Sequence, residues 1–240
     1  MTDELFREDA TLTECEARVV AHAEGGVILD RTVFYPLGGG QAGDTGRLRD
    51  AEGREFTVID TRKSKEHPGA VLHLLAPDAA APAIGAQVTA RIDTARREAH
   101  RRFHTATHLL CALIPHPVDG CSITAGYARL DFHMNEPLDK EAINAGLARL
   151  VAEAHPVRHR WISEAELDAN PGLVRSMSVQ PPRGLGRVRV LEIEGVDLQP
   201  CGGTHVANTR EVGDVVVTKI EKKSAMTRRV VLGFAEPAEG

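Results

Sequence analysis

The chain has 240 residues, of which 42% are hydrophobic and 26% are charged, and this ordinary globular composition excludes wholesale disorder. With one tryptophan, two tyrosines and six phenylalanines, it is not the composition of a protein whose binding is dominated by aromatic stacking. The net charge of -5 is unevenly distributed, because residues 1–60 carry 6 basic and 13 acidic side chains. The charge itself does not predict a polyanionic partner, but if the protein has one, we expect it to bind the remainder of the chain.

Targeting and membrane signals are weak. No apolar run approaches the ~20 residues that a membrane span requires, and the first ten residues are acidic where a signal peptide would be basic and then apolar. Four cysteines are too few for a disulfide scaffold. These features predict a cytoplasmic protein with free thiols and no membrane partner, and they leave the oligomeric state open.

The first part of the chain is typical of a small β-barrel. Short β-branched segments alternate with turn signals, which predicts strands at 17–22, 26–30, 55–61 and 88–92, a hairpin turn at 50–53 and a turn or linker at 76–85. Between the strands lies the glycine-rich segment Gly38, Gly39, Gly40 and Gln41. It lacks the Lys-Ser/Thr of a phosphate loop and the remainder of a dinucleotide fingerprint, so no dinucleotide cofactor is expected. A plain β-turn and a functional loop both remain possible, and Asp44 can pin such a turn.

The second part of the chain changes to helical periodicity. Apolar residues at three- and four-residue steps predict a helix from Asp93 or Thr94 to about Pro115. Asp139 can cap a second helix, and a capping box at 163–166 opens a short third helix that ends near Asn170. The apolar stripes are Phe103, Ala106, Leu110 and Leu113 in the first helix, and Ile143, Leu147, Leu150, Val151 and Ala154 in the second. Strands are expected at 187–193, 214–221 and 228–234, the last two as a hairpin. The prediction is an α+β protein with a β-barrel domain at 1–90, followed at 91–240 by an α+β domain with helices on a mainly antiparallel sheet.

Four side chains form a candidate metal site. His104 and His108 are spaced i,i+4 on one face of the predicted helix, and Cys201 and His205 flank two glycines in a tight loop. Taken alone, the histidine pair is often a coincidence and Cys201 is more often a buried apolar thiol. Together they supply the nitrogen and sulfur ligands that suit Zn²⁺. A His-Glu-x-x-His protease is excluded because position 105 is threonine.

Several motifs resemble one family. Residues 101–110 and 201–206 are similar to the two zinc motifs of the editing domain of alanyl-tRNA synthetase. That domain is shared with freestanding alanyl-tRNA editing proteins of the AlaX type and related to the editing domain of the threonyl enzyme. Residues 34–46 resemble the family's glycine-rich element, and residues 213–223 with Arg228 and Arg229 resemble its last hairpin. The matches run in family order from about residue 15 to 235, with no segment that could house an adenylate-forming domain, so a freestanding editing protein is expected.

The resemblance implies a zinc-dependent deacylase that acts on mischarged tRNA(Ala), with serine as the main target and glycine as a second one. It implies that His104, His108, Cys201 and His205 hold zinc and that the glycine-rich loop borders the site. Gln41 and Thr105 are expected to contact the seryl side chain, although a threonine inside a helix usually bonds its own backbone. Asp131 is expected to be structural or to orient a zinc histidine. The expected RNA contacts are Arg101, Arg102, Lys222, Lys223, Arg228 and Arg229, although charge clusters are usually solvated surface.

Two alternatives stay open. Four protein ligands close the coordination of a zinc ion, as in structural sites, whereas catalysis needs an open position. The chain could therefore be a non-catalytic tRNA-binding module with a structural zinc, or an unrelated metal hydrolase. In a deacylase, the metal could activate water or only position the substrate.

Overall fold

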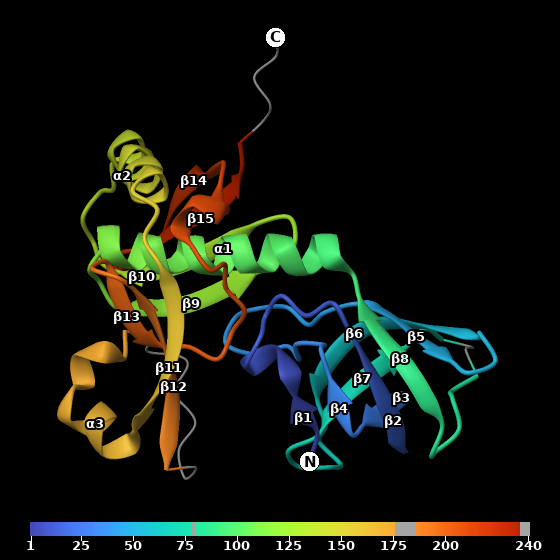
Figure 1. The fold of residues 1–240 in the computed structure, drawn as a ribbon. Helices are drawn as coiled ribbons and strands as arrows, with labels where there is room; N and C mark the ends of the chain where they lie inside the picture. The colour runs from blue at the N-terminus through green and yellow to red at the C-terminus, as the bar shows by residue number, and fades with distance from the viewer. Residues whose placement is uncertain (78–79, 176–185, 236–240) are drawn as a thin grey trace. The chain divides into compact units, whose positions relative to one another are not determined.

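The structure, a computed structural model, describes residues 1–77, 80–175 and 186–235. The protein belongs to the α+β class and consists mostly of strands with few helices, as predicted (Figure 1). The chain forms two compact units, Met1–Glu98 and Ala99–Gly240, and the boundary between them falls within helix α1 (Thr94–Leu113). The predicted division into functional domains at residue 90 stays a prediction.

A closed barrel of six strands forms the first unit, which confirms the predicted barrel. Every neighbouring pair is antiparallel, in the order β2-β3-β7-β6-β5-β8. The strands are β2 (Glu14–Ala23), β3 (Gly26–Leu29), β5 (Gly46–Asp50), β6 (Glu55–Lys63), β7 (Val71–Leu75) and β8 (Gln87–Ile92). Outside the barrel, β1 (Asp3–Glu4) pairs in parallel with β4 (Arg31–Thr32), and a 3-10 turn, η1, spans Leu5–Arg7.

The barrel core comes from alternating inward side chains, which include Val19, Val27, Leu48, Val58 and Ala90. The predicted turn at 50–53 joins β5 to β6, and Gly53 has the positive φ of 81° that glycine tolerates best. Two barrel strands were not predicted. β5 has a single large apolar side chain, Leu48, between two arginines, and β7 carries a buried histidine, His73, at its centre.

The second unit contains two antiparallel sheets. The larger has the order β14-β15-β10-β9 and the smaller the order β11-β12-β13. Their strands are β9 (Val118–Ile123), β10 (Ala128–His133), β11 (Val157–Ser163), β12 (Arg187–Ile193), β13 (Asp197–Pro200), β14 (Val215–Ser224) and β15 (Thr227–Phe234). The predicted hairpin of the last two strands is confirmed.

The helices begin where the sequence predicts. α1 starts at Thr94, and Phe103, Ala106 and Leu110 of its apolar stripe are fully buried. α2 (Lys140–Ala152) is capped by Asp139, whose side chain accepts a hydrogen bond from the Ala142 amide, 3.0 Å away. α3 (Glu164–Ala169) has the predicted capping box. One detail was wrong: α2 ends at Ala152, so Ala154, with a φ of 57°, does not belong to its apolar stripe.

The core of this unit packs α1 and α2 against the larger sheet and one end of the smaller one. Its buried members include Phe103, Leu147, Phe132, Leu191 and Val230. A second, smaller cluster joins α3 to the smaller sheet through Leu167, Ile162, Val188 and Val190. Short 3-10 turns lie at η2 (Pro171–Leu173) and η3 (Thr209–Val212). Among the described residues, no helix combines the length and apolarity needed to cross a bilayer.

Candidate metal centre

His104, His108, Cys201 and His205 converge on one point within the second unit. One ligand atom from each of the four side chains lies within 4.8 Å of the other three. The Cys201 Sγ is 3.4 Å from the His104 Nε2 and 3.1 Å from the His205 Nε2. The three histidines are buried, and Cys201 is partly buried. Helix α1 supplies two of these side chains one turn apart, and the loop after β13 supplies the other two, as the spacing predicts.

Contacts from neighbouring elements hold this loop. Arg189 of β12 is buried, and its Nη1 donates hydrogen bonds to the Cys201 carbonyl, 2.9 Å away, and to the Gly203 carbonyl, 3.2 Å away. The Arg101 Nε on α1 donates to the His205 carbonyl over 2.9 Å. Neither glycine of the loop has a positive φ. The convergence of Cys201 and His205 therefore depends on these arginine contacts more than on glycine's conformational freedom.

Electrostatics single out Cys201 among the thiols. Burial raises the pKa of Cys111 to about 12, and that of Cys121 to about 12 as well. Burial also acts to raise the pKa of Cys201, but the charges of His104 and His205 and hydrogen bonds from the histidines hold it well below the usual value. Burial lowers the pKa of His205, so its imidazole is neutral. A thiolate and a neutral imidazole are the forms that bind metal ions.

His108 is oriented by a buried carboxylate, Asp197, which no motif in the sequence predicted. Its Nδ1 lies 2.8 Å from the Asp197 Oδ2, and the Gln199 Nε2 donates to both oxygens of Asp197, at 3.0 and 2.9 Å. Burial lowers the pKa of His108, but the hydrogen bonds to Asp197 and Cys201 outweigh burial and raise it to about 10. Asp131, which we considered for this role, pairs with Arg229 at 2.7 Å and with Arg129 at 2.7 Å.

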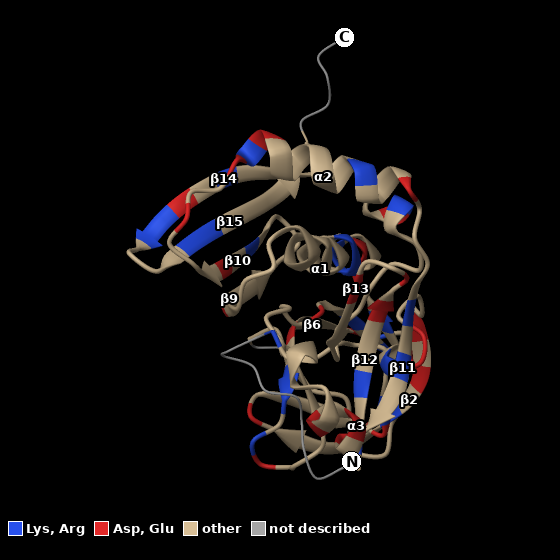
Figure 2. Cartoon of the chain, turned by 90° about the vertical axis from the view of Figure 1, so that its left-hand side faces the viewer, with Lys and Arg blue, Asp and Glu red and all other residues tan. Residues whose placement is uncertain are grey.

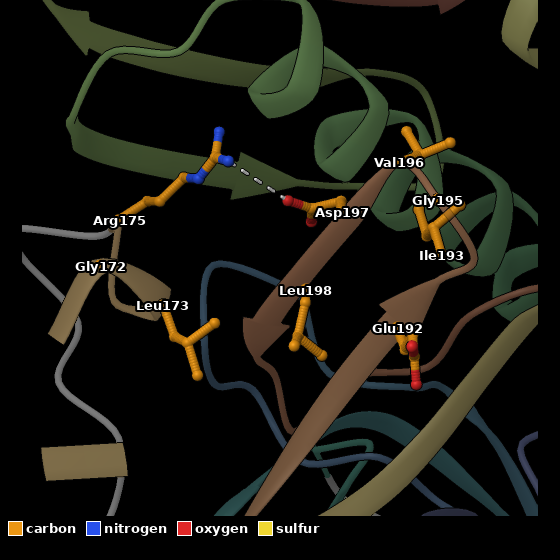
Figure 3. A pocket seen from close by; sticks show the side chains of 9 residues that line it. All are labelled: Gly172, Leu173, Arg175, Glu192, Ile193, Gly195, Val196, Asp197 and Leu198. Atoms are coloured by element: carbon orange, nitrogen blue, oxygen red, sulfur yellow. Dashed lines mark ion pairs between the residues drawn. The ribbon is translucent and has the colours of Figure 1, made fainter. Parts of the chain in front are cut away.

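A surface pocket of about 360 Å³ lies next to Asp197. Arg175 reaches toward the carboxylate of Asp197, with its Nη2 3.8 Å from the Oδ1 (Figure 3). Leu173, Leu198 and Glu192 also line the pocket. Asp197 thus connects this pocket to a histidine of the cluster, although its own side chain has no exposed surface.

Thr105 and Gln41 are both fully buried. The Thr105 Oγ1 donates to the Arg101 carbonyl over 2.9 Å, accepts from the Val206 amide over 3.2 Å, and lies 3.4 Å from the His205 Nδ1. Gln41 closes a tight turn with Gly38 through two backbone hydrogen bonds, and Gly39 and Gly40 at its centre have positive φ values of 59° and 85°. The glycine-rich segment is thus a β-turn in the first unit. Any substrate contact of Thr105, Gln41 or these glycines stays a prediction.

Asp44 fixes this turn, as its position in the sequence suggested. Its carboxylate accepts a hydrogen bond from the Tyr35 amide, 2.7 Å away, and pairs with Arg97, which is also buried. The Arg96 Nε donates to the Gly43 carbonyl over 3.1 Å. Arg96 and Arg97, in the first turn of α1, therefore hold the end of the glycine-rich loop in place through Gly43 and Asp44.

The predicted RNA-binding residues differ in their surroundings. Lys222 and Lys223 are exposed on the β14–β15 hairpin, which carries several basic residues (Figure 2). Arg101 and Arg228 are buried, and Arg228 donates to the Glu136 carbonyl over 3.1 Å. Arg102 donates to the Val212 carbonyl over 2.9 Å and lies over the Phe234 ring, and Arg229 pairs with Asp131. The RNA contacts of all six residues stay predictions.

The donor set fits a metal ion. In a tetrahedral zinc site with ordinary bond lengths, a sulfur and a nitrogen ligand are about 3.5 Å apart. The two Sγ–Nε2 distances of 3.4 and 3.1 Å are close to this value. Three imidazole nitrogens and one thiolate therefore form a cluster that can bind a metal ion.

Comparisons with known proteins match both units. A family model described as "Threonyl and Alanyl tRNA synthetase second additional domain" matches residues 188–231, and one described as "tRNA synthetases class II (A)" matches residues 7–96. The alanyl-tRNA editing protein AlaX-M of Methanosarcina mazei is 33% identical over 253 residues, covering 100% of this chain and 99% of that protein. AlaX-M of Saccharolobus solfataricus is 33% identical over 236 residues, covering 96% of this chain and 98% of that protein.

Alanine–tRNA ligases also match, but over a fraction of their length. The ligase of Korarchaeum cryptofilum is 34% identical over 98% of this chain, which spans 26% of the ligase. The fold, the cluster and these matches define the class: proteins built on the second additional domain of alanyl- and threonyl-tRNA synthetases. Within this class, the chain belongs to the family of alanyl-tRNA editing proteins of the AlaX-M type.

Proposed function

We propose that the protein is a zinc-dependent deacylase that hydrolyses the ester of mischarged tRNA(Ala). Serine is its main target and glycine a second one. The observation that carries the proposal is the cluster of three histidines and one cysteine in a chain of the AlaX-M family, whose relatives are named alanyl-tRNA editing proteins. A free tRNA-editing enzyme of this kind acts in the cytoplasm.

Zinc is the metal that this donor set favours. His104, His108 and His205 would supply nitrogen, and the Cys201 thiolate would supply sulfur. Bound zinc provides Lewis acidity toward an ester carbonyl and lowers the pKa of a bound water. The chain itself holds Cys201 and His205 deprotonated, through their lowered pKa values, and it holds the donors in fixed directions through Asp197 and Arg189.

A chemical need explains why serine is the main target. A binding pocket built for alanine cannot strongly exclude a similar side chain that carries one additional hydroxyl, so a separate hydrolytic site is required. That site must spare alanine, and we propose that Gln41 and Thr105 bind the seryl hydroxyl. A polar group left unpaired when alanine occupies the site costs about 1–3 kcal/mol, or roughly one to two orders of magnitude in selectivity.

We further propose a division of work along the chain. Residues 1–90 would contribute the glycine-rich loop with Gly38, Gly39, Gly40 and Gln41, and residues 91–240 would contribute the zinc site and most of the RNA contacts. Among the basic residues, Lys222 and Lys223 are exposed and are the leading candidates for contacts with tRNA phosphates. Arg101, Arg102, Arg228 and Arg229 already contact other groups of the protein, so their part in RNA binding would be secondary.

The direct test is a deacylation assay with Ser-tRNA(Ala), Gly-tRNA(Ala) and Ala-tRNA(Ala). We expect hydrolysis of the seryl and glycyl esters, sparing of the alanyl ester, and loss of activity after treatment with a chelator. Binding of tRNA without hydrolysis would favour a tRNA-binding module with a structural zinc, which the closed set of four donors would suit. Hydrolysis of simple esters without preference for aminoacyl-tRNA would favour an unrelated metal hydrolase.

A further inference from the structure

We infer that Trp161 and Arg187 form a stacking site for a base at the single-stranded end of a tRNA. Trp161 is the only tryptophan of the chain, and its side chain is partly exposed. The guanidinium carbon of Arg187 lies 4.5 Å from the centroid of its ring. This inference rests on the proposed function, because its ligand is the substrate of that function.

The pairing of β11 with β12 sets the position of this site. Trp161 is directly opposite Arg189, and Ser163 is directly opposite Arg187. Directly opposite side chains in an antiparallel pair project from the same face, with Cβ atoms about 4.5–5.5 Å apart. Trp161, Arg187 and Arg189 therefore share one face of the smaller sheet.

Arg189 links this face to the metal centre. The Arg189 Nη1 donates hydrogen bonds to the carbonyls of Cys201 and Gly203, at 2.9 and 3.2 Å. In return, the Cys201 amide donates a hydrogen bond to the Arg189 carbonyl over 3.1 Å. The residue opposite Trp161 is thus the residue that holds the loop of Cys201 and His205. In the sheet, β12 stands between β11, which carries Trp161, and β13, whose following loop carries Cys201 and His205, and all three strands belong to one compact unit.

The two faces of the sheet differ in charge pairing. On the opposite face, Arg160 lies 3.4 Å from Glu192 and Arg158 lies 4.0 Å from Glu194. Arg187 is exposed, and among the described residues it forms no ion pair. A guanidinium that is not neutralised by a carboxylate can attract phosphate while its plane extends the stacking surface of the ring.

This combination suits the end of a tRNA. Proteins bind single-stranded nucleic acid by placing bases on aromatic rings and arginine planes next to basic side chains. In the proposed substrate, the scissile ester joins the amino acid to the last ribose, so the last bases must lie close to the metal-binding donors whenever the ester does. Stacking contacts the face of a base and does not distinguish one base from another. Such a contact is sufficient for the CCA end, because its sequence is the same in all tRNAs.

Intrinsic fluorescence tests the inference directly, because all tryptophan emission comes from Trp161. The probes are an acceptor-stem minihelix of tRNA(Ala) that ends in CCA and the same minihelix without its last three nucleotides. We expect saturable quenching by the first and little quenching by the second. Base–aromatic stacking is worth about 1–3 kcal/mol, so Trp161→Ala should weaken binding by about tenfold or more, as measured by filter binding.

Matched variants separate stacking from folding. Arg187→Ala should weaken minihelix binding several-fold, whereas Arg158→Ala removes an arginine from the other face of the sheet and should leave binding unchanged. Trp161→Phe keeps a ring and should retain most of the affinity. Circular dichroism and metal content check that each variant is folded.

Three outcomes would overturn the inference: minihelix binding without a change in emission, equal quenching by the truncated minihelix, or no minihelix binding at all. These outcomes are distinct from a failure of the proposed function, which the wild-type protein would reveal by not hydrolysing Ser-tRNA(Ala). A protein that hydrolyses Ser-tRNA(Ala) but shows no quenching would retain the proposed function and lose the stacking site.

Discussion

Two histidines of the cluster have hydrogen-bonding partners at Nδ1, on the far side of the ring from the metal-binding Nε2. Asp197 accepts from the Nδ1 of His108, and the hydroxyl of Thr105 lies near the Nδ1 of His205. A proton held on Nδ1 leaves the lone pair of Nε2 free for a metal ion. Asp197 is in turn fixed by Gln199, so the direction of the His108 ring does not depend on solvent.

Asp197→Asn should therefore weaken zinc binding by about 10–100-fold, because an amide keeps the shape but loses the charge that orients His108. Zinc affinity can be measured by competition with a chromogenic chelator. Asp131→Asn is the matched control, since Asp131 pairs with Arg229 and Arg129. Equal zinc affinities for the wild type and Asp197→Asn would contradict the proposed role.

Thr105→Val tests the contact with the seryl hydroxyl. The variant keeps the shape and removes the hydroxyl, so it should reduce hydrolysis of Ser-tRNA(Ala) more than hydrolysis of Gly-tRNA(Ala). The Thr105 hydroxyl already donates its proton to the Arg101 carbonyl, so a seryl group must compete for it. We therefore expect the preference for Ser-tRNA(Ala) over Gly-tRNA(Ala) to fall by about tenfold, the lower end of the range for one hydrogen bond. Equal losses for both substrates would assign Thr105 to holding His205 and Val206 in place. Gln41→Ala, compared in the same way, would then test the other candidate.

His73 makes the stability of the barrel dependent on pH. Burial lowers the pKa of His73 to about 4 from an ordinary value of 6.5. In the neutral ring, Nδ1 carries the proton because it faces the Val27 carbonyl, 3.3 Å away, so Nε2 accepts a hydrogen bond from the Thr32 hydroxyl at 2.8 Å. The unfolded chain binds the proton more tightly, so this group costs nothing above pH 6.5 and destabilises the fold as pH falls from 6.5 toward 4.

We expect His73→Gln to reduce the loss of unfolding free energy between pH 7.5 and pH 5 by about 2 kcal/mol relative to the wild type. Urea denaturation at the two pH values measures this difference. Any loss of unfolding free energy that has another cause, such as release of metal, is the same in both proteins and cancels in the comparison. His67→Gln replaces an exposed histidine in the same unit and should keep the wild-type dependence. The same pH dependence in His73→Gln and the wild type would contradict the account.

At the scale of elements, local sequence signals were sufficient to predict the helices but not about half of the strands. The caps at Asp139 and Ser163 and the apolar period of α1 are properties of short segments, and α1, α2 and α3 were all predicted. β9 has no clear alternation of burial, and β11 carries Arg158 and Arg160, so neither is evident from its residues. β9 becomes a strand by pairing with β10, which follows it directly in the chain, and β11 by pairing with the more distant β12.

The β14–β15 hairpin yields a prediction for RNA binding. Lys222→Ala combined with Lys223→Ala should weaken tRNA binding and flatten its salt dependence, because each lost phosphate contact reduces counterion release. Filter binding at several salt concentrations measures both effects. Lys63→Ala combined with Lys65→Ala removes the same charge from exposed positions of the barrel unit and should change little. If the hairpin variant kept the wild-type affinity and salt slope, these lysines would be solvated surface.

At the scale of the whole molecule, both halves of the metal cluster could be predicted, but the groups that support them could not. His104 and His108 lie four residues apart, as do Cys201 and His205, so each pair is evident locally. Asp197 lies 89 residues from His108, and the hydrogen bonds of Arg189 to the loop depend on the register between β12 and β13. Such contacts arise only when the sheet assembles, and the same holds for the stacking of Arg187 on Trp161.

The central claim is that one zinc ion per chain, held by this cluster, is required for hydrolysis of Ser-tRNA(Ala). Stepwise return of zinc to metal-free protein, with the deacylation rate measured at each step, tests it most directly. The account predicts a rate that rises linearly and stops rising at one zinc per chain, and a His104→Ala/His108→Ala double variant that neither retains zinc nor recovers activity. Full activity in the metal-free protein, or zinc retained by the double variant, would contradict it.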